Sequence, residues 1–337
     1  MDFKSLLKEA NVDAILLSNH IERNNSNFVY VTQEKNIDAW VLISDKLLLY
    51  VSPLEIGNVK TAKFNLKPMT KEMFKEIDAE LKNKKVGLDF EYLSVNDLKR
   101  LNEKFKDVEF VDISKTFENK RMVKTDEEIE KIKGACDICD KIMDKVFSEG
   151  HKFKTELELK EFMENEMKKF RVTPSFPTIV ASGKNSAIPH HVPDNTKLKG
   201  FTVLDFGVVY GNYCSDISRT IYFGMPSKEE KENYTKVLSI QQECTNMIKE
   251  GVKFKDIHNH ANERLDGKFL HLIGHGLGID YHESPQMSDE LKENMIITIE
   301  PGIYFPEKYG IRIEDDIVVK EKPIVLNKTT KELIIIN

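Results

Sequence analysis

Residues 201–220, FTVLDFGVVYGNYCSDISRT, contain two β-rich runs separated by Gly211-Asn212. A Gly-Asn pair in this position predicts a β-hairpin with a two-residue loop. In the register that such a loop sets, Asp205 lies opposite Ser218, and Asp216, two residues before Ser218, lies on the same face. Both runs are mainly apolar, so each aspartate stands where a core residue is expected.

The two aspartates are diagonal neighbours in this register, with Cα atoms roughly 7–8 Å apart. Gly207 lies opposite Asp216, and we expect its missing side chain to leave the space between the carboxylates empty. Two carboxylates at this distance repel each other unless a cation lies between them. The alternative is an exposed hairpin face with ordinary acids, which the apolar surroundings disfavour. A bulge in either run would break the register.

Length and composition limit the class of protein. The chain has 337 residues, of which 40% are apolar and 31% charged, as in a folded protein of about two domains. Its net charge of -6 argues against a nucleic-acid partner, which needs a basic surface. No apolar run approaches the roughly 18 residues that cross a bilayer, and the N-terminal MDFKSLLKEA does not resemble a secretory signal. With only four cysteines, we expect a cytoplasmic protein that uses neither disulfides nor a membrane.

The alternation of strand-like and helix-like segments predicts an α/β domain over residues 1–120 and a second domain over residues 121–337. The predicted strands of the first domain are VDAILLS, DAWVLIS, KLLLYVS, KVGLDF and VEFVDI, and its predicted helices are TKEMFKEIDAELKNK and SVNDLKRLNEKFK. In the second domain we expect helices over residues 125–148, 155–170, 228–250 and 255–265. Strand pairs between and after these helices contain most of the histidines.

The motif CDIC at Cys136 and Cys139 has the spacing of a redox or zinc pair. It lies in a predicted helix that begins with a capping box, TDEE at residues 125–128, and both cysteines fall on the apolar stripe of that helix. No second cysteine pair completes four zinc ligands. We therefore favour buried, inert thiols over a metal or redox pair.

Three further segments place a metal-ligating type of side chain in apolar surroundings. MIITIEPGIYF contains Glu300, and YGIRIEDDIVV contains Glu314 with Arg312 on the same strand face. HLIGHGLGIDYHESP places His275 between two glycines, with His282 seven residues later. A lone embedded histidine is usually a satisfied core group. Its coincidence with four strand-embedded acids favours a functional site.

Four carboxylates and one imidazole suit two divalent ions, because four negative charges balance two dications. A set of mostly oxygen ligands with one nitrogen favours Mn²⁺ or Co²⁺, with Fe²⁺ or Zn²⁺ as alternatives. Two ions roughly 3.5–4 Å apart can share a water, lower its pKa and supply hydroxide to a carbonyl group.

The motifs LDFGVVYGNYCSDISRT, GHGLG, ITIEPGIY and IRIEDD resemble those of the pita-bread metallopeptidases, which include Xaa-Pro dipeptidases, aminopeptidases P and methionine aminopeptidases. The resemblance covers the whole chain, more strongly in its C-terminal part. It implies an α+β fold, with a pita-bread catalytic domain over residues 121–337 after a creatinase-type α/β domain over residues 1–120. It also implies that the ligands of a dinuclear centre are Asp205, Asp216, His275, Glu300 and Glu314.

The resemblance extends to residues around the metal ligands. It makes Glu300 a proton shuttle as well as a ligand. AIPHHVPDN aligns His190 with a family histidine near the scissile carbonyl, and His191 is the weaker candidate. His282 corresponds to a second histidine that steadies the tetrahedral intermediate. Arg312 is expected to orient carboxylates rather than to contact substrate.

The N-terminal domain separates the branches of the family. Methionine aminopeptidases generally lack it, whereas Xaa-Pro enzymes carry it and use it to cap the partner's active site in a homodimer. The resemblance therefore implies a homodimeric enzyme whose substrate is a small peptide with proline at the second position. The scissile nitrogen of such a peptide has no hydrogen, so a site built around an N–H contact would reject it.

Dipeptidases of this family often have an arginine just past HExP that holds the substrate carboxylate. Here HESPQMS has Gln286, which can donate a hydrogen bond but supplies no charge. The compact length still matches short bacterial dipeptidases, so we favour an Xaa-Pro dipeptidase, with an Xaa-Pro aminopeptidase acting on longer peptides as the alternative. A non-catalytic binding protein on the same scaffold is disfavoured because all five ligand positions and both histidines are present.

Overall fold

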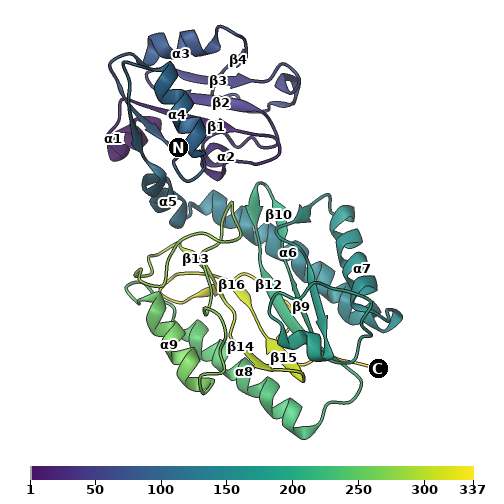
Figure 1. Ribbon diagram of the computed structural model, residues 1–337. Coiled ribbons are helices and arrows are strands. Elements are labelled where there is room, and N and C mark those ends of the chain that lie inside the picture. Colours follow the sequence, from purple (N-terminus) through teal and green to yellow (C-terminus); the bar gives the residue numbers. More distant parts are fainter. Residues whose placement is uncertain (1) are drawn as a thin grey trace. The chain divides into compact units, whose positions relative to one another are not determined.

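The computed structural model describes residues 2–337, and the chain forms two compact units, Met1–Arg121 and Met122–Asn337 (Figure 1). Both units mix helices with sheets, so the chain is an α+β protein. Within residues 2–337, none of the helices has both the length and the apolar character that crossing a bilayer requires.

The first unit is a six-stranded sheet with helices on both faces. Its strand order is β4-β3-β2-β1-β5-β6, with antiparallel pairing only between β1 and β2 and between β2 and β3. The strands are β1 (Ala14–Asn19), β2 (Ala39–Ile43), β3 (Leu47–Val51), β4 (Asn65–Pro68), β5 (Lys85–Leu88) and β6 (Glu109–Asp112). The helices are α1 (Phe3–Ala10), α2 (Ser26–Thr32), α3 (Met73–Leu81), α4 (Val95–Lys104) and α5 (Ser114–Met122), with a 3₁₀ turn at Ile56–Asn58.

Alternating residues of β1 show how the sheet is covered. Ile15 and Leu17 pack with α1, α2 and α5, whereas Leu16 packs on the other face with α3 and α4. The five predicted strands are confirmed, and so are the two predicted helices. Strand β4 was not predicted because NLKP is short, exposed and without apolar alternation.

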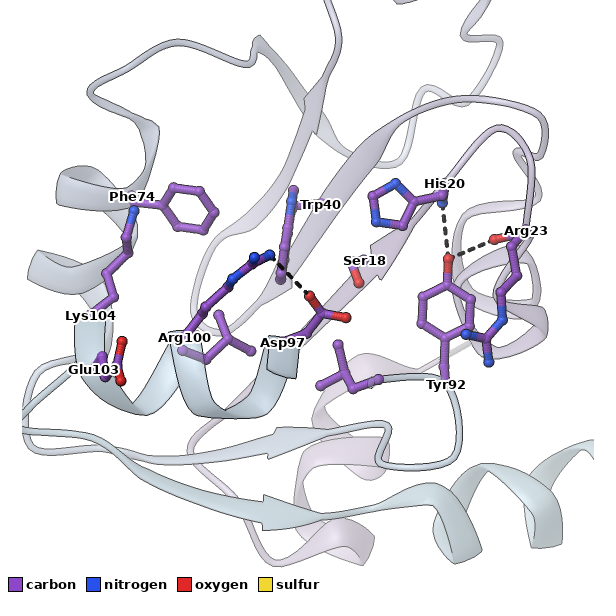
Figure 2. A pocket seen from close by; sticks show the side chains of 12 residues that line it. Ser18, His20, Arg23, Trp40, Phe74, Tyr92, Asp97, Arg100, Glu103 and Lys104 are labelled. Carbon is purple, nitrogen blue, oxygen red and sulfur yellow. Dashed lines mark hydrogen bonds and ion pairs between the residues drawn. The ribbon is translucent and has the colours of Figure 1, made fainter. Parts of the chain in front are cut away.

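A pocket of about 600 Å³ lies in the first unit, beside β1, β2, α3 and α4 (Figure 2). Trp40 and Phe74 line it in an edge-to-face contact, with ring centroids 5.6 Å apart. The charged groups at its rim stay in solvent: the Arg100 side chain is 79% exposed and lies 3.9 Å from Asp97. In residues 2–337, the groups of three or more side chains that could hold a metal ion all lie in the second unit.

The second unit contains four longer helices and several small sheets (Figure 1). The helices are α6 (Asp126–Glu149), α7 (Glu156–Lys169), α8 (Lys228–Met247) and α9 (Phe254–Arg264), with 3₁₀ turns at Gly150–Lys152 and Gly183–Ala187. The first strands are β7 (Thr173–Pro174), β8 (Ile179–Ser182), β9 (Gly200–Phe206), β10 (Val208–Tyr210), β11 (Tyr213–Cys214) and β12 (Ile217–Phe223). The later ones are β13 (Ile296–Ile299), β14 (Gly302–Phe305), β15 (Tyr309–Arg312), β16 (Asp315–Val318), β17 (Ile324–Val325) and β18 (Ile335–Ile336).

The four predicted helices of this unit are confirmed. Helix α6 begins at the predicted capping box, in which Thr125 and Glu128 each bond the other's backbone N–H. Cys136 and Cys139 are fully buried on its inner face, where burial raises the pKa of both thiols. Helices α6 and α7 pack on the sheet of β8, β9 and β12, and α8 and α9 pack against β13 to β16.

The register predicted for the hairpin is confirmed in both of its ladders, which belong to different sheets. Asp205 pairs with Ser218 in β9 and β12, and the two-residue loop joins β10 to β11 with the same alignment. One expectation at Gly207 is wrong. The glycine does not leave an empty space, because a Cβ there would lie 1.7 Å from the carbonyl oxygen of Ser215. Its role is to let the two strands approach closely where they pass from one sheet to another.

Candidate metal centre

The five predicted metal ligands come from five separate stretches of the second unit, four of them at or next to strand ends. Asp205 is on β9, Asp216 precedes β12, Glu300 follows β13 and Glu314 precedes β16. His275 lies in a loop, and the residue after it, Gly276, forms a β-bridge to Ile297 of β13. The N–H of Glu314 donates to the carbonyl of Ser218, which joins the β12 and β16 stretches directly.

The structure brings these five side chains into one connected group. Ligating atoms of Asp216, His275 and Glu314 all lie within 4.8 Å of one another. His275 Nε2 is 3.7 Å from Asp216 Oδ2 and 3.8 Å from Glu300 Oε1. These distances are too long for hydrogen bonds. The imidazole and the carboxylates therefore face one another without bonding directly.

Arg312 ties Asp205 to the rest of the group. Its Nη2 donates to Asp205 Oδ2 at 2.6 Å, and its Nε donates to Ser218 Oγ at 2.9 Å. The Ser218 hydroxyl in turn donates to Glu314 Oε2 at 2.7 Å. Arg312 is 3% exposed and is the last residue of β15.

Burial and mutual repulsion make the carboxylates costly to ionise in the metal-free protein. Burial, followed by the charge of Glu314, raises the pKa of Asp216 well above its usual range. Burial, followed by the charge of Glu300, does the same to the pKa of Glu314. Burial raises the pKa of Glu300 itself to about 8. Four acids with one guanidinium among them need further positive charge if all are to be ionised together.

Two buried carboxylate oxygens of the group have no hydrogen-bond donor among the described residues. They are Asp205 Oδ1 and Asp216 Oδ1, both inaccessible to solvent. A buried acceptor left without a donor typically costs about 1–3 kcal/mol. Cations bound between these oxygens would satisfy them, so the residues fit the divalent ions that the sequence predicts.

His275 has the form that a metal ligand needs. Its Nδ1 lies 3.1 Å from the carbonyl oxygen of Gly276, to which only an N–H can donate. Burial lowers the pKa of His275 to about 3, so the ring is neutral and Nε2 presents a lone pair to the acids.

The predicted catalytic histidines divide between two places. The ring of His282 lies 4.1 Å from that of His275, and burial, followed by the charge of His190, lowers the pKa of His282. His190 is exposed, and the carbonyl of the preceding Pro189 accepts Arg312 Nη1 at 3.4 Å, which places this segment next to the same group. His191 points elsewhere: its Nε2 is 2.7 Å from Glu156 Oε2.

Two residues of the site were not singled out from the sequence. His271 Nδ1 lies 3.6 Å from Glu300 Oε2, and its Nε2 accepts the hydroxyl of Tyr304 at 2.7 Å. The Tyr304 oxygen accepts Arg312 Nη1 at 3.1 Å, so hydrogen bonds run from Asp205 through Arg312 and Tyr304 to His271, whose ring lies beside Glu300. Both residues lie four positions from a predicted ligand, which is the signal that could have found them.

Each part of the chain matches the model of a known protein family. Residues 130–321 match the model of "Metallopeptidase family M24", and residues 2–123 match that of the "Creatinase/Prolidase N-terminal domain". The chain belongs to metallopeptidase family M24. It is therefore a peptidase, of a family whose members work with divalent metal ions.

The relatives are of similar length and architecture. The chain is 37% identical to the Xaa-Pro dipeptidase of Pyrococcus furiosus over 309 residues, which cover 87% of this chain and 88% of the relative. The solved Xaa-Pro dipeptidase of Bacillus anthracis superimposes with a TM-score of 0.89 and 31% identity, over 99% of this chain and 98% of that one. The X-Pro aminopeptidase of Thermotoga maritima superimposes with a TM-score of 0.92 and 30% identity, over 98% and 100%.

Proposed function

We propose that this M24 peptidase uses two divalent metal ions to hydrolyse the bond before proline, and that Xaa-Pro dipeptides are its main substrates. The proposal of two metal ions rests on two buried carboxylate oxygens, Asp205 Oδ1 and Asp216 Oδ1, which have no hydrogen-bond donor among the described residues. The substrate part is supported by the Xaa-Pro dipeptidases of Pyrococcus furiosus and Bacillus anthracis among the relatives.

Four carboxylates and one imidazole would hold the two ions. Mn²⁺ or Co²⁺ suits this set best, with Fe²⁺ or Zn²⁺ as alternatives. The ligands are Asp205, Asp216, His275, Glu300 and Glu314. When bound, such a pair of ions lowers the pKa of a water between them and supplies hydroxide near neutral pH.

The protein side chains then move protons and stabilise charge. Glu300 accepts the proton of the attacking water and passes it to the proline nitrogen, which leaves only after protonation. His282 and His190 donate hydrogen bonds where negative charge develops on the scissile carbonyl oxygen. The pKa of His282 is lowered by burial, so its ring is neutral at pH 7 and has one N–H to donate.

Arg312 and Tyr304 would hold the carboxylates rather than the substrate. Arg312 fixes Asp205 through a hydrogen bond of 2.6 Å, and Tyr304 bonds Arg312 on the side facing His271. Partners of this kind typically change metal affinity or activity about 10–100-fold when they are removed.

A second candidate is an Xaa-Pro aminopeptidase that accepts longer peptides. It is favoured by Gln286, which has no charge to hold a free carboxylate after proline, and by the likeness to the Thermotoga maritima X-Pro aminopeptidase. The amide of Gln286 lies 3.5 Å from Ser284 Oγ, and its backbone N–H donates to Asp289. A neutral amide here restricts substrate length less strictly than an arginine would.

One set of assays decides between the two. The metal-free enzyme is reconstituted separately with Mn²⁺, Co²⁺ and Zn²⁺ and given Xaa-Pro dipeptides, Xaa-Pro-Yaa tripeptides and a matched Xaa-Ala dipeptide. We expect rapid cleavage of Xaa-Pro, slower cleavage of the tripeptide and little of Xaa-Ala. Comparable or faster tripeptide cleavage would assign the aminopeptidase, and no cleavage of any proline substrate with any metal would refute the proposal.

We further expect a homodimer in the cytoplasm, as in the capped Xaa-Pro enzymes that the sequence resembles. Light scattering of the purified full chain measures the mass directly. A monomeric mass together with full activity would show that capping by a partner is not required.

A further inference from the structure

A second group of acids and a histidine lies outside the proposed metal centre. Glu156, the first residue of α7, is fully buried, and both of its oxygens are occupied. Its Oε1 accepts the N–H of Ser182 at 2.6 Å and Asn185 Nδ2 at 3.1 Å. Its Oε2 lies 2.7 Å from His191 Nε2 and accepts the N–H of Asp194 at 3.2 Å.

The four partners of Glu156 lie within residues 182–194, from the last residue of β8 into the connection that leads to β9. The backbone N–H of Glu156 also donates to the carbonyl of Thr196 just beyond it. Hydrogen bonds to a buried carboxylate are stronger than those between neutral groups. One side chain therefore fixes the start, the middle and the end of this connection to the first turn of α7.

The connection carries His190, which is held on either side. On one side the carbonyl of Pro189 accepts Arg312 Nη1 at 3.4 Å, next to the metal centre. On the other side the His191 ring bonds Glu156. His190 stands between these two anchors, and its charge acts on the pKa of His282 and His271.

This group is not a second metal site, although ligating atoms of Glu156, His191 and Asp194 lie within 4.8 Å of one another. Two of the four donors to Glu156 are backbone N–H groups, which an ion would have to displace from a buried position. Asp194 is exposed, and its Oδ1 already accepts the N–H of Thr196 at 2.6 Å. The geometry is that of a saturated hydrogen-bond acceptor.

We infer that Glu156 is a positioning residue for catalysis: through His191 and the loop it holds, it keeps His190 where that ring can donate to the substrate carbonyl. This inference rests on the proposed function, which gives His190 that role. In Glu156→Gln an amide N–H₂ must face groups that are themselves donors, so the loop loosens while the ligands of the ions stay in place. A displacement of about 1 Å at a catalytic group can cost roughly 100-fold in rate.

A double-mutant cycle tests the inference in the full chain loaded with Mn²⁺, with an Xaa-Pro dipeptide as substrate. We expect Glu156→Gln to lower kcat about 10–100-fold and to change KM less than about 3-fold, since His190 acts mainly in the transition state. In the His190→Ala background the same substitution should change kcat less than about 2-fold, because the group that it positions is absent. Glu158→Gln, in the same turn of α7 but exposed, is the control that leaves kcat unchanged.

The outcomes separate the inference from the proposed function. If His190→Ala alone leaves kcat unchanged, the role proposed for His190 is wrong. If His190→Ala lowers kcat but Glu156→Gln costs as much in both backgrounds, Glu156 serves the fold alone and the inference is overturned. Should Glu156→Gln not fold, His191→Gln, which keeps a donor toward Glu156, should retain most of kcat, whereas His191→Phe should lose it. Equal kcat in those two variants would contradict the inference.

Discussion

The second unit contains two groups that share one composition, two carboxylates and an imidazole within 4.8 Å of one another, yet their chemistry differs. In the first, His191 lies 2.7 Å from Glu156, and four donors occupy both oxygens of that glutamate. In the second, His275 stays 3.7 Å from Asp216, and Asp216 Oδ1 has no donor within residues 2–337. Residue types and proximity do not identify a metal site. The supply of donors distinguishes these two groups, because several buried carboxylates without enough donors favour a bound cation.

The surroundings of the two groups explain the difference. Glu156 begins a helix and faces a loop whose backbone N–H groups are free to bond it. Asp216 and Glu314 stand beside strands whose backbone groups mostly bond one another, and their nearest side-chain neighbours include further acids. For all the acids of the second group to be ionised together, positive charge from outside the chain is needed in addition to Arg312.

The largest expected effect comes from the same substitution made in both groups. Asp216→Asn should lower peptidase activity by about 1,000-fold or more, since even the partners of metal ligands typically matter 10–100-fold. Asp194→Asn is the matched control and should stay within about 2-fold of the wild type, because its exposed side chain touches neither substrate nor ion. Steady-state assays at saturating Mn²⁺ measure both. Equal losses in the two variants would remove the distinction between the groups.

The next effect concerns the one guanidinium inside the acid cluster. Arg312→Lys keeps the charge but loses the fork that bonds Asp205, Ser218 and Tyr304 at once. We expect the free energy of unfolding to fall by about 1.5–3 kcal/mol, the usual worth of hydrogen bonds to a charged group. Urea unfolding measures this change in the metal-free protein.

Arg264→Lys provides the exposed counterpart. Arg264 also bonds a carboxylate, Glu243, with two nitrogens, but its side chain is 47% exposed. An exposed pair of this kind contributes less than about 1 kcal/mol. A loss at Arg264 as large as the loss at Arg312 would show that burial of the cluster does not set the strength of these bonds.

A smaller effect is the pH dependence of stability without metal. Burial raises the pKa values of Glu300 and Asp316 to about 8 in the folded protein, against 4.5 and 3.8 for the free side chains. At pH values between the unfolded and the folded pKa, the folded state binds more protons than the unfolded state. The free energy of unfolding is therefore greatest at low pH and falls as pH rises toward 8. Thermal unfolding from pH 5 to 8 should show this fall, and Glu300→Gln should reduce it. A metal-free protein that becomes more stable over this range would contradict the raised pKa values of these buried acids.

The smallest effect is expected at the CDIC motif. Cys136 and Cys139 are buried, and burial raises the pKa of both thiols, so neither is reactive. Cys139→Ala should keep activity within about 2-fold, and the folded protein should not react with a thiol reagent. Rapid modification of native Cys136 or Cys139 with loss of activity would show that the motif is functional.

The sequence predicted well those features that local residues determine. The capping box and apolar stripe placed α6, and Gly211-Asn212 set a register that aligned Asp205 with Ser218. It could not show that the strands leave one sheet for another near Gly207, because that bend depends on the packing of Ser215 against the glycine. Short elements such as α2 and β4 have too few residues for a periodic pattern.

In the candidate site, too, the sequence predicted what local residues determine and missed what depends on tertiary packing. The five proposed ligands stand out in the sequence because acids in apolar strands are unusual, and the structure places them together. The direction of His191 could not be foreseen, since its partner Glu156 lies 35 residues earlier and carries no local signal. His271 and Tyr304 were visible in the motifs, but their bonds depend on how β14 and β15 pair.

The measurement that tests the central claim most directly is the number of ions bound by each variant. Metal-free wild type, Asp216→Asn and Asp194→Asn are dialysed against Co²⁺, and the ions retained per chain are counted by atomic emission. We predict two ions for the wild type and for Asp194→Asn, and fewer for Asp216→Asn. No retained ion in the wild type, or full retention in Asp216→Asn, would contradict the assignment of the buried acids to a metal centre.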